Sequence, residues 1–217
     1  MSLQSFEAVI FDMDGLLLDS ERISFNTFRE TLKQFNLKED NELFYQMIGK
    51  DERSWRKLLK ESLSDKIDTD KFARVWSDLY QREISKPIPV KDGAEALLTY
   101  LKELKMVTAV ATSTKTKMAK EKLKNAGLLE SFDLIIGGDQ VKKGKPHPEI
   151  YLLVAERLSV NPQRCLALED SENGVKSAVS AKMSVIQIPD MVQPSEELKK
   201  LGHTIFVSLE DVVGYDF

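Results

Sequence analysis

The chain has 217 residues, of which 42% are hydrophobic and 30% are charged, and its formal net charge is −4. This length suffices for one large domain or for a core domain with a smaller companion, and the composition is that of an ordinary globular protein. The charge balance gives no sign of a nucleic-acid-binding surface, and no apolar stretch reaches the roughly 20 residues that a membrane span needs.

The first predicted element is a strand over residues 6–11, which is followed at once by Asp12, Asp14 and Gly15. Successive side chains of an extended chain point to opposite faces, so both carboxylates can enter one site only if the chain turns after Asp12. Gly15 permits such a turn. Taken alone, acids and a glycine at a strand end are as typical of a simple turn as of a site.

Between residues 20 and 86 the pattern changes to helical spacing without any β-rich run. Three groups of apolar residues carry it: Ile23, Phe28, Leu32 and Phe35; Trp55, Leu58, Leu59 and Leu63; and Phe72, Val75, Trp76, Leu79 and Tyr80. The stretch 85–93, with two prolines and a glycine, is typical of a return linker. We therefore predict an inserted all-helical cap domain over residues 18–87, on a core made of residues 1–17 and 88–217.

After residue 100, short apolar runs alternate with helical stretches. The runs predict strands at 107–111, 132–138, 165–169 and 183–188, and the intervening patterns predict helices at 115–125, 148–158 and 172–180. This alternation is typical of βαβ units, so the predicted fold class is α/β with a Rossmann-like parallel sheet. The lysines of residues 115–124 indicate a solvated helix face.

Cys165 falls in one of these apolar runs and is the only cysteine. We interpret it as a buried strand residue rather than a nucleophile. A single cysteine also excludes an intramolecular disulfide, which favours a reducing compartment and a cytoplasmic location.

Polar side chains follow each of several predicted strands at the carboxyl end, where parallel strands of one sheet meet. They are Asp12 and Asp14; Thr112, Ser113 and Thr114; Lys145, in the loop before a helix; and Glu169, Asp170 and Ser171. Acids, hydroxyls and one lysine suit phosphoryl transfer with Mg²⁺, in which a carboxylate accepts the phosphoryl group and a second carboxyl transfers protons. Separately, each has a simpler interpretation: a turn, a helix start, a surface lysine, or a helix N-cap at Ser171 or Asp170.

Four segments, "DMDGLLLDSE", "TST", "GKPHPEIY" and "LEDSENGVKSA", resemble the four ordered motifs of the haloacid dehalogenase superfamily, in its phosphatase and phosphoglucomutase branch with a small helical cap. The resemblance covers nearly the whole chain. It implies a Mg²⁺-dependent phosphatase that hydrolyses a small phosphomonoester, with a sugar phosphate as the expected substrate, through an aspartyl-phosphate intermediate. We expect no nucleic-acid or membrane partner, and a monomer or weak dimer.

The resemblance also implies a role for each acid. Asp12 is expected to be the nucleophile and a metal ligand. Asp14 is expected to be the general acid/base, with its backbone carbonyl also meeting the metal. Asp170 would complete the Mg²⁺ shell, with Glu169 close by or acting through water.

For the phosphoryl group, the resemblance implies three further contacts. Thr112 would hold a phosphate oxygen through its hydroxyl, helped by the backbone N–H of Ser113. Lys145 would neutralise the charge between the nucleophile and the phosphate.

A receiver domain uses a similar set of acids, hydroxyl and lysine, but it lacks a helical insertion after the first acid pair.

The alternative function is that of a β-phosphoglucomutase, whose core motifs look nearly identical. That mutase carries a histidine soon after the first motif, and a lysine and an arginine that bracket a glycine of the cap. Here Ser24 stands at the place of the histidine, and Ile48 and Glu52 stand where the two basic residues are expected. Three basic residues nevertheless remain candidates for binding the substrate: Lys50, Arg53 and Lys115.

Overall fold

The computed structural model describes residues 3–215, and its central feature is a sheet of six parallel strands in the order β3-β2-β1-β4-β5-β6. The strands are β1 (Ala8–Phe11), β2 (Val107–Thr112), β3 (Leu134–Gly137), β4 (Cys165–Glu169), β5 (Ser184–Gln187) and β6 (Thr204–Ile205). All five predicted strands are confirmed, although the first begins two residues later than predicted. The short β6 was not predicted.

The register of the three central strands brings their carboxyl ends to one level. Phe11 at the end of β1 pairs with Val110 of β2 and with Leu168 of β4. The backbone N–H of Asp12 donates to the Leu168 carbonyl at 2.9 Å, which extends the ladder by one residue. From β1 the chain adds β2 and β3 on one side and then β4, β5 and β6 on the other. A crevice is expected at the carboxyl ends of the strands where this change of side occurs.

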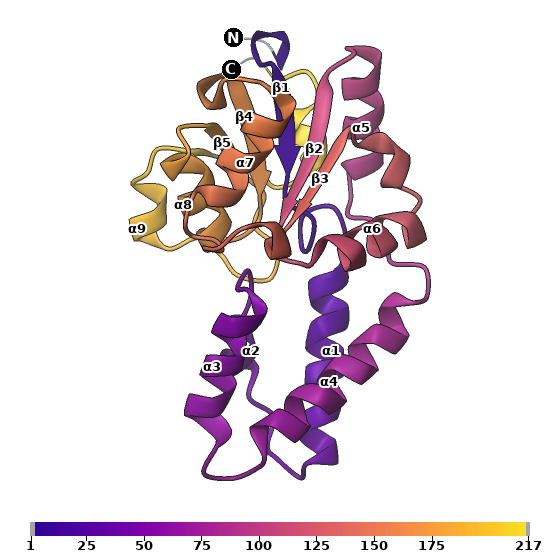
Figure 1. Ribbon diagram of the computed structural model, residues 1–217, viewed down its shortest axis with the longest axis vertical. Coiled ribbons are helices and arrows are strands. Elements are labelled where there is room, and N and C mark those ends of the chain that lie inside the picture. The colour runs from indigo at the N-terminus through magenta and orange to yellow at the C-terminus, as the bar shows by residue number, and fades with distance from the viewer. Residues whose placement is uncertain (1–2, 216–217) are drawn as a thin grey trace.

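Helices cover both faces of the sheet, as Figure 1 shows. They are α5 (Ala94–Glu103), α6 (Thr116–Asn125), α7 (Glu149–Leu158), α8 (Glu172–Ser180) and the short α9 (Glu196–Lys199). Apolar residues of α5 and α6 share one hydrophobic cluster with Val9 and Phe11, and those of α7 and α8 share another with Ala8 and Ile10. Alternate residues of β1 thus face opposite helical layers, which explains why the strand is apolar throughout. The predicted α6, α7 and α8 are confirmed, whereas α5 had no predicted counterpart.

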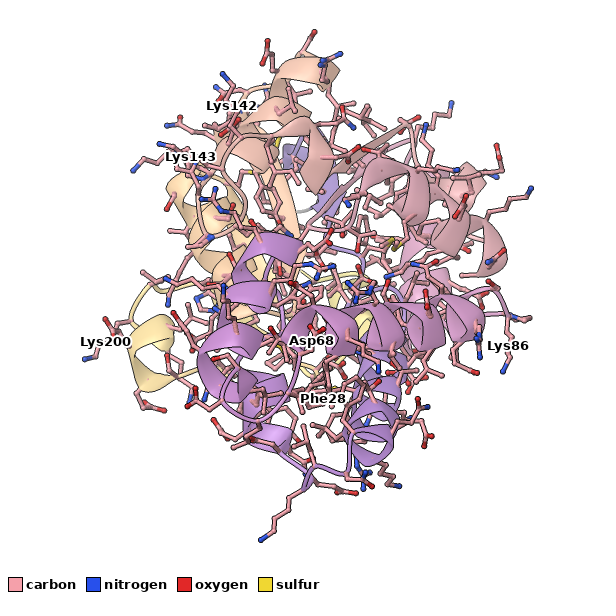
Figure 2. The ribbon with its side chains drawn as sticks, turned by 60° about the horizontal axis from the view of Figure 1, so that its bottom comes forward. Phe28, Asp68, Lys86, Lys142, Lys143 and Lys200 are labelled. Atoms are coloured by element: carbon pink, nitrogen blue, oxygen red, sulfur yellow. The ribbon has the colours of Figure 1, made fainter. Side chains whose placement is uncertain are left out.

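Four further helices form a separate group beyond the carboxyl ends of the strands (Figure 1). They are α1 (Ser20–Gln34), α2 (Asn41–Tyr45), α3 (Glu52–Leu63) and α4 (Thr69–Ile84). They have a hydrophobic cluster of their own that includes Phe28, which is labelled among these helices in Figure 2. Phe28 is fully buried, and its ring lies against those of Phe44, Phe72 and Trp76. Three aspartates cap α2, α3 and α4: Asp40, Asp51 and Asp68.

The two connections between the sheet layer and this helical group pair with each other. The backbone N–H of Asp19 donates to the Pro89 carbonyl, and that of Lys91 donates to the Leu17 carbonyl, each at 2.9 Å. This pairing and the separate cluster support a cap over residues 18–87, a division of the chain that stays a prediction. Residues 1, 2, 216 and 217 lie outside the described residues. Within the described part, no helix combines the length and the apolar character needed to cross a bilayer.

Candidate active site

A buried lysine joins the carboxyl ends of the three central strands. The Lys145 ammonium donates to Asp12 Oδ1 at 2.6 Å, to Glu169 Oε1 at 2.5 Å and to the Ala111 carbonyl at 2.9 Å. Its three protons are thereby all used. Burial opposes the charge, but the carboxylates of Asp12 and Glu169 more than offset this and raise the pKa of Lys145 above its usual value. Lys145 therefore carries a fixed positive charge at this edge of the sheet.

The carboxylate of Glu169 is held on every side. The Tyr151 hydroxyl on α7 donates to Oε1 at 2.7 Å, and the backbone N–H and hydroxyl of Ser171 donate to Oε2 at 3.3 Å and 3.2 Å. Ser171 is also the N-cap of α8, as one of the simpler interpretations predicted, because its hydroxyl accepts from the Gly174 N–H. A Cβ atom at Gly174 would lie 1.8 Å from the Glu169 carboxylate, so only glycine fits at that position.

Three buried acids meet beside Lys145. One carboxylate oxygen from each of Asp12, Glu169 and Asp170 lies within 4.8 Å of the other two. Burial raises the pKa of Asp12 to about 7, opposed by Lys145 and reinforced by the charges of Glu169 and Asp14. Burial and the neighbouring carboxylates also raise the pKa of Asp170 well above its usual value. These acids offer several oxygen donors, and together they carry more negative charge than Lys145 can balance. Such a site suits a hard divalent cation such as Mg²⁺.

The turn predicted after Asp12 is confirmed and depends on glycine. Gly15 has a φ of +86°, in the left-handed region. A Cβ atom there would also lie 2.5 Å from Asp170 Oδ2. Gly15 thus lets the first acid loop pass close to the acids that follow β4.

Asp14 is held by a second buried lysine. Its Oδ1 accepts from the Lys122 ammonium at 2.6 Å and from the Ser20 hydroxyl at 2.5 Å, and its Oδ2 accepts from the Thr114 hydroxyl at 2.7 Å. Burial raises the pKa of this carboxyl, but Lys122 and the two hydroxyls more than offset burial, and the pKa lies below its usual value. The prediction of a solvated helix face over residues 115–124 is wrong at Lys122, whose side chain is only 2% exposed.

The surroundings of the two acids in the first loop therefore shift their pKa values in opposite directions, upward for Asp12 and downward for Asp14. The charge of Asp14 contributes to the raised pKa of Asp12, so the carboxylates lie near each other. Asp14 is nevertheless not one of the three acids whose oxygens converge. The Thr112 hydroxyl lies on the Asp14 side, where it accepts from the Thr114 N–H and donates to Asp14 Oδ2 at 3.4 Å.

A cavity of about 550 Å³ lies between this edge of the sheet and the helical group. All but one of the predicted site residues line it: Asp12, Asp14, Lys50, Arg53, Thr112, Ser113, Lys115, Lys145 and Asp170. The exception is Glu169, which is fully buried behind Lys145. Lys115 pairs with Glu52 of α3 at 2.9 Å, so its charge is partly balanced. Trp55 and Trp76, predicted as core residues of the cap, also line the cavity.

Three supporting residues were missed: Tyr151, Lys122 and Ser20. Tyr151 ends the quoted segment "GKPHPEIY", so its position was available as a signal. Ser20 lies in the quoted segment "DMDGLLLDSE". Lys122 has no comparable signal, because it is one lysine among several on α6.

The raised pKa values of Asp12 and Asp170 predict that the metal-free protein loses stability as pH rises. Between about pH 4 and pH 7 the folded Asp12 binds a proton that the unfolded chain has released, so this stabilising contribution is lost as pH rises through about 7. From pH 5 to pH 7 the loss from Asp12 is about 3 kcal/mol, or roughly 5–10 °C in Tm. Thermal unfolding in EDTA should show Tm falling from pH 5 to pH 8, and Mg²⁺ should raise Tm more at pH 8 than at pH 5. A flat Tm in EDTA over this range would contradict the prediction.

Comparison with known proteins gives one family. Residues 9–188 match the profile of the haloacid dehalogenase-like hydrolases. A phosphorylated carbohydrates phosphatase from Thermotoga maritima is 35% identical over 208 residues, which cover 95% of this chain and 96% of that protein. A fructose-1-phosphate phosphatase from Escherichia coli K12 is 27% identical over 190 residues, which cover 85% and 97% of the two chains.

Solved structures agree in fold. A Thermotoga maritima structure, provisionally described as a β-phosphoglucomutase, superposes with a TM-score of 0.77 at 34% identity, over 95% of this chain and 96% of that chain. The Rhodobacter sphaeroides protein CbbY in complex with phosphate superposes with a TM-score of 0.78 at 26% identity, over 95% and 96% of the chains.

Proposed function

This chain belongs to the haloacid dehalogenase-like hydrolases, and on that premise we propose that it is a Mg²⁺-dependent phosphatase that hydrolyses a small sugar phosphate through an aspartyl-phosphate intermediate. Its enzyme class, a phosphoric monoester hydrolase, follows from the family and from its phosphatase relatives. The observation that carries the proposal is the buried Lys145 ammonium between Asp12 and Glu169, with Asp170 beside them. This arrangement offers a nucleophile, a positive charge and cation ligands at one point.

The donor set fits a magnesium ion. In the proposal Asp12 and Asp170 hold it through their carboxylates, Asp14 through its backbone carbonyl, and Glu169 directly or through water. When bound, the ion balances the charge of the buried acids and polarises the phosphoryl oxygens. Lys145 alone cannot supply that balance, because its single charge pairs with Asp12 and Glu169 while the carboxylate of Asp170 lies beside them.

In the first proposed step, a carboxylate oxygen of Asp12 attacks phosphorus. A new O–P bond forms, and the ester P–O bond breaks with its electron pair on the leaving oxygen. The Thr112 hydroxyl and the Ser113 N–H contact the phosphoryl oxygens, and the nearby positive charge of Lys145 offsets the negative charge that builds up between the nucleophile and the phosphate. Glu169 and Tyr151 support this step indirectly, since both lie against Lys145 and fix its position.

Asp14 is the proposed proton carrier for both steps. It gives a proton to the leaving oxygen, and it later takes one from the water that attacks phosphorus and releases Asp12. The contact with Lys122 favours the ionised form, which suits the second step. To donate a proton in the first step, the Asp14 carboxyl must move away from Lys122.

The substrate proposal rests on the cavity and on the relatives. A volume of about 550 Å³ accommodates a small phosphorylated molecule rather than a macromolecule. The printed names of two relatives specify phosphorylated carbohydrates and fructose 1-phosphate. Lys50, Arg53 and Lys115 line the cavity and are proposed to contact the substrate beyond the transferred phosphoryl group.

A screen for released inorganic phosphate tests the proposed function. The full-length protein is incubated with Mg²⁺ and a panel of phosphorylated sugars, nucleotides and phosphoglycolate, and parallel reactions contain EDTA in place of Mg²⁺. We expect release from at least one sugar phosphate, no release in EDTA, and recovery on adding excess Mg²⁺. Release from nucleotides alone, or full activity in EDTA, would refute the proposal.

A phosphosugar mutase of the β-phosphoglucomutase type is the second candidate. Two observations favour it: the Thermotoga maritima structure with that provisional description, and the basic residues Lys50 and Arg53 in the cavity. Ser24, at the place where the mutase has a histidine, and Glu52, which pairs with Lys115, argue against it.

The products of one reaction separate the two candidates. A mutase must hold the distal phosphate of a bisphosphate and must keep water from the phospho-enzyme until a sugar hydroxyl attacks. We expect β-glucose 1-phosphate, with a catalytic trace of the 1,6-bisphosphate, to yield inorganic phosphate and little glucose 6-phosphate. Both products are measured in the same sample. Glucose 6-phosphate forming much faster than free phosphate would establish the mutase instead.

A further inference from the structure

A carboxyl group on the first turn of α1 faces the cavity without a partner. Glu21 lines the cavity, and no residue of the described range 3–215 forms a hydrogen bond or an ion pair with its side chain. Its neighbour Arg22 cannot neutralise it, because that guanidinium pairs with Asp19 and Asp190. A polar group in this position is available to a ligand.

The charges around Glu21 define which part of a substrate it can receive. Burial raises its pKa to about 8, and the charges of Asp14, Asp12 and Asp190 reinforce this, whereas Lys122 opposes it. Lys122 is committed to Asp14 at 2.6 Å. A second phosphate is therefore a poor partner for Glu21, since the carboxyl group would repel it and the two neighbouring cations, Lys122 and Arg22, are already paired. An uncharged hydroxyl is a good partner, because it can donate to a carboxylate or exchange hydrogen bonds with a carboxylic acid.

Other polar side chains continue this surface along two helices. Ser24 follows Glu21 by three residues on α1, and Ser77 and Gln81 are separated by four residues on α4, so each pair shares a helix face. All four side chains line the cavity. Within the described residues, neither serine hydroxyl forms a hydrogen bond with another residue. We call these four residues, Glu21, Ser24, Ser77 and Gln81, the polar strip.

The cavity also has an aromatic wall. Trp55 and Trp76 line it, with their ring centroids 5.1 Å apart. The indole N–H of Trp76 is already used by the Ser24 carbonyl and the Thr27 hydroxyl, so Trp76 offers only apolar ring surface to a ligand. A polar strip together with an aromatic wall suits a molecule that has both hydroxyl groups and C–H surface, as sugars and polyols have.

We propose that Glu21 is a specificity-determining residue that hydrogen-bonds a hydroxyl group of the organic part of a sugar or polyol phosphate, with the rest of the polar strip receiving further hydroxyls. This inference rests on the proposed function and deepens it, because it selects polyhydroxylated phosphomonoesters over aryl or alkyl ones. The transferred phosphoryl group stays with Lys145 and the acids. Glu21 contributes to the choice of leaving group.

The test compares two substrates in three variants. The sugar substrate is fructose 1-phosphate, and the reference is p-nitrophenyl phosphate, which has no hydroxyl group on its organic part. We expect Glu21→Ala to lower the ratio of kcat/KM for fructose 1-phosphate to kcat/KM for p-nitrophenyl phosphate by roughly 10- to 100-fold. Glu21→Gln keeps an accepting oxygen and should restore the ratio to within about fivefold of the wild-type value. Glu30→Ala, an exposed residue on the same helix, is the matched control and should leave both kcat/KM values unchanged.

Each outcome decides a specific point. A tenfold or larger fall of the ratio in Glu21→Ala, with rescue in Glu21→Gln, supports the inference. An unchanged ratio overturns it, as does a wild-type enzyme that hydrolyses p-nitrophenyl phosphate but not fructose 1-phosphate or any other sugar or polyol phosphate. A wild-type enzyme that releases phosphate from none of these substrates overturns the proposed function itself. Thermal unfolding of each variant establishes that it is folded, and the ratio cancels any difference in active fraction.

Discussion

Replacing Asp12 with asparagine is expected to lower turnover by about 10⁴-fold or more, because an amide is a poor nucleophile and cannot form the proposed aspartyl-phosphate. The variant should remain folded. Lys145 keeps its contacts with Glu169 and the Ala111 carbonyl, and the asparagine oxygen can still accept from it. Asparagine also carries no charge, so the variant avoids the burial of a charged group and the repulsion by Glu169 and Asp14 that together raise the pKa of Asp12 in the wild type.

The measurement is phosphate release from the best substrate of the screen, with wild type and variant purified in parallel to exclude contaminating phosphatases. Tm in EDTA at pH 8 should be equal to or higher than that of the wild type. Asp78→Asn, an exposed aspartate on α4, is the matched control and should keep full activity. Retention of more than a few per cent of activity by Asp12→Asn would exclude Asp12 as the nucleophile.

The sheet and its carboxyl edge could be predicted because local patterns determine them. Apolar runs bounded by polar residues located β1 to β5, and the rule that parallel strands end at one edge placed Asp12, Thr112, Lys145 and Asp170 at one cavity. The two-residue β6 and helix α5 were not predicted. The two residues of β6 are too few for a pattern to register.

The surroundings of Asp14 could not be predicted from the sequence. Nothing in the spacing of α6 distinguishes Lys122 from its lysine neighbours, and its burial arises from contacts far apart in the chain: Asp14 in the first loop and the Tyr80 ring on α4. The unpartnered state of Glu21 has the same origin, since it depends on where Lys122 and Arg22 direct their charges. Tertiary contacts of this kind leave no local signal.

Replacing Lys145 with methionine is expected to affect both turnover and stability. The change leaves Asp12, Glu169 and Asp170 buried without the cation that joins them, and removing one partner of a buried ion pair costs about 3–5 kcal/mol. Turnover should fall by about 10³-fold, because the charge that offsets the phosphoryl oxygens is lost with it.

The pH and metal dependence of this variant distinguish lost charge from lost packing. The pKa of Lys145 is raised in the folded protein, so its charge contributes stability over the whole range below pH 10. The cost of removing it should nevertheless be larger at pH 8 than at pH 5, because Asp12 is protonated at pH 5 and fewer charges remain to be balanced. Mg²⁺ should restore more of the Tm of Lys145→Met than of the wild type, since it supplies the missing positive charge to the same oxygens.

Lys143→Met is the matched control, because that lysine lies two residues away and its side chain points outward from the molecule (Figure 2). It should match the wild type in Tm and turnover at both pH values. If Lys145→Met lost equal stability at pH 5 and pH 8, with no greater response to Mg²⁺ than the wild type, its role would be packing of the methylene chain rather than charge. The buried ammonium would then no longer be the group that holds the nucleophile and the metal ligands together.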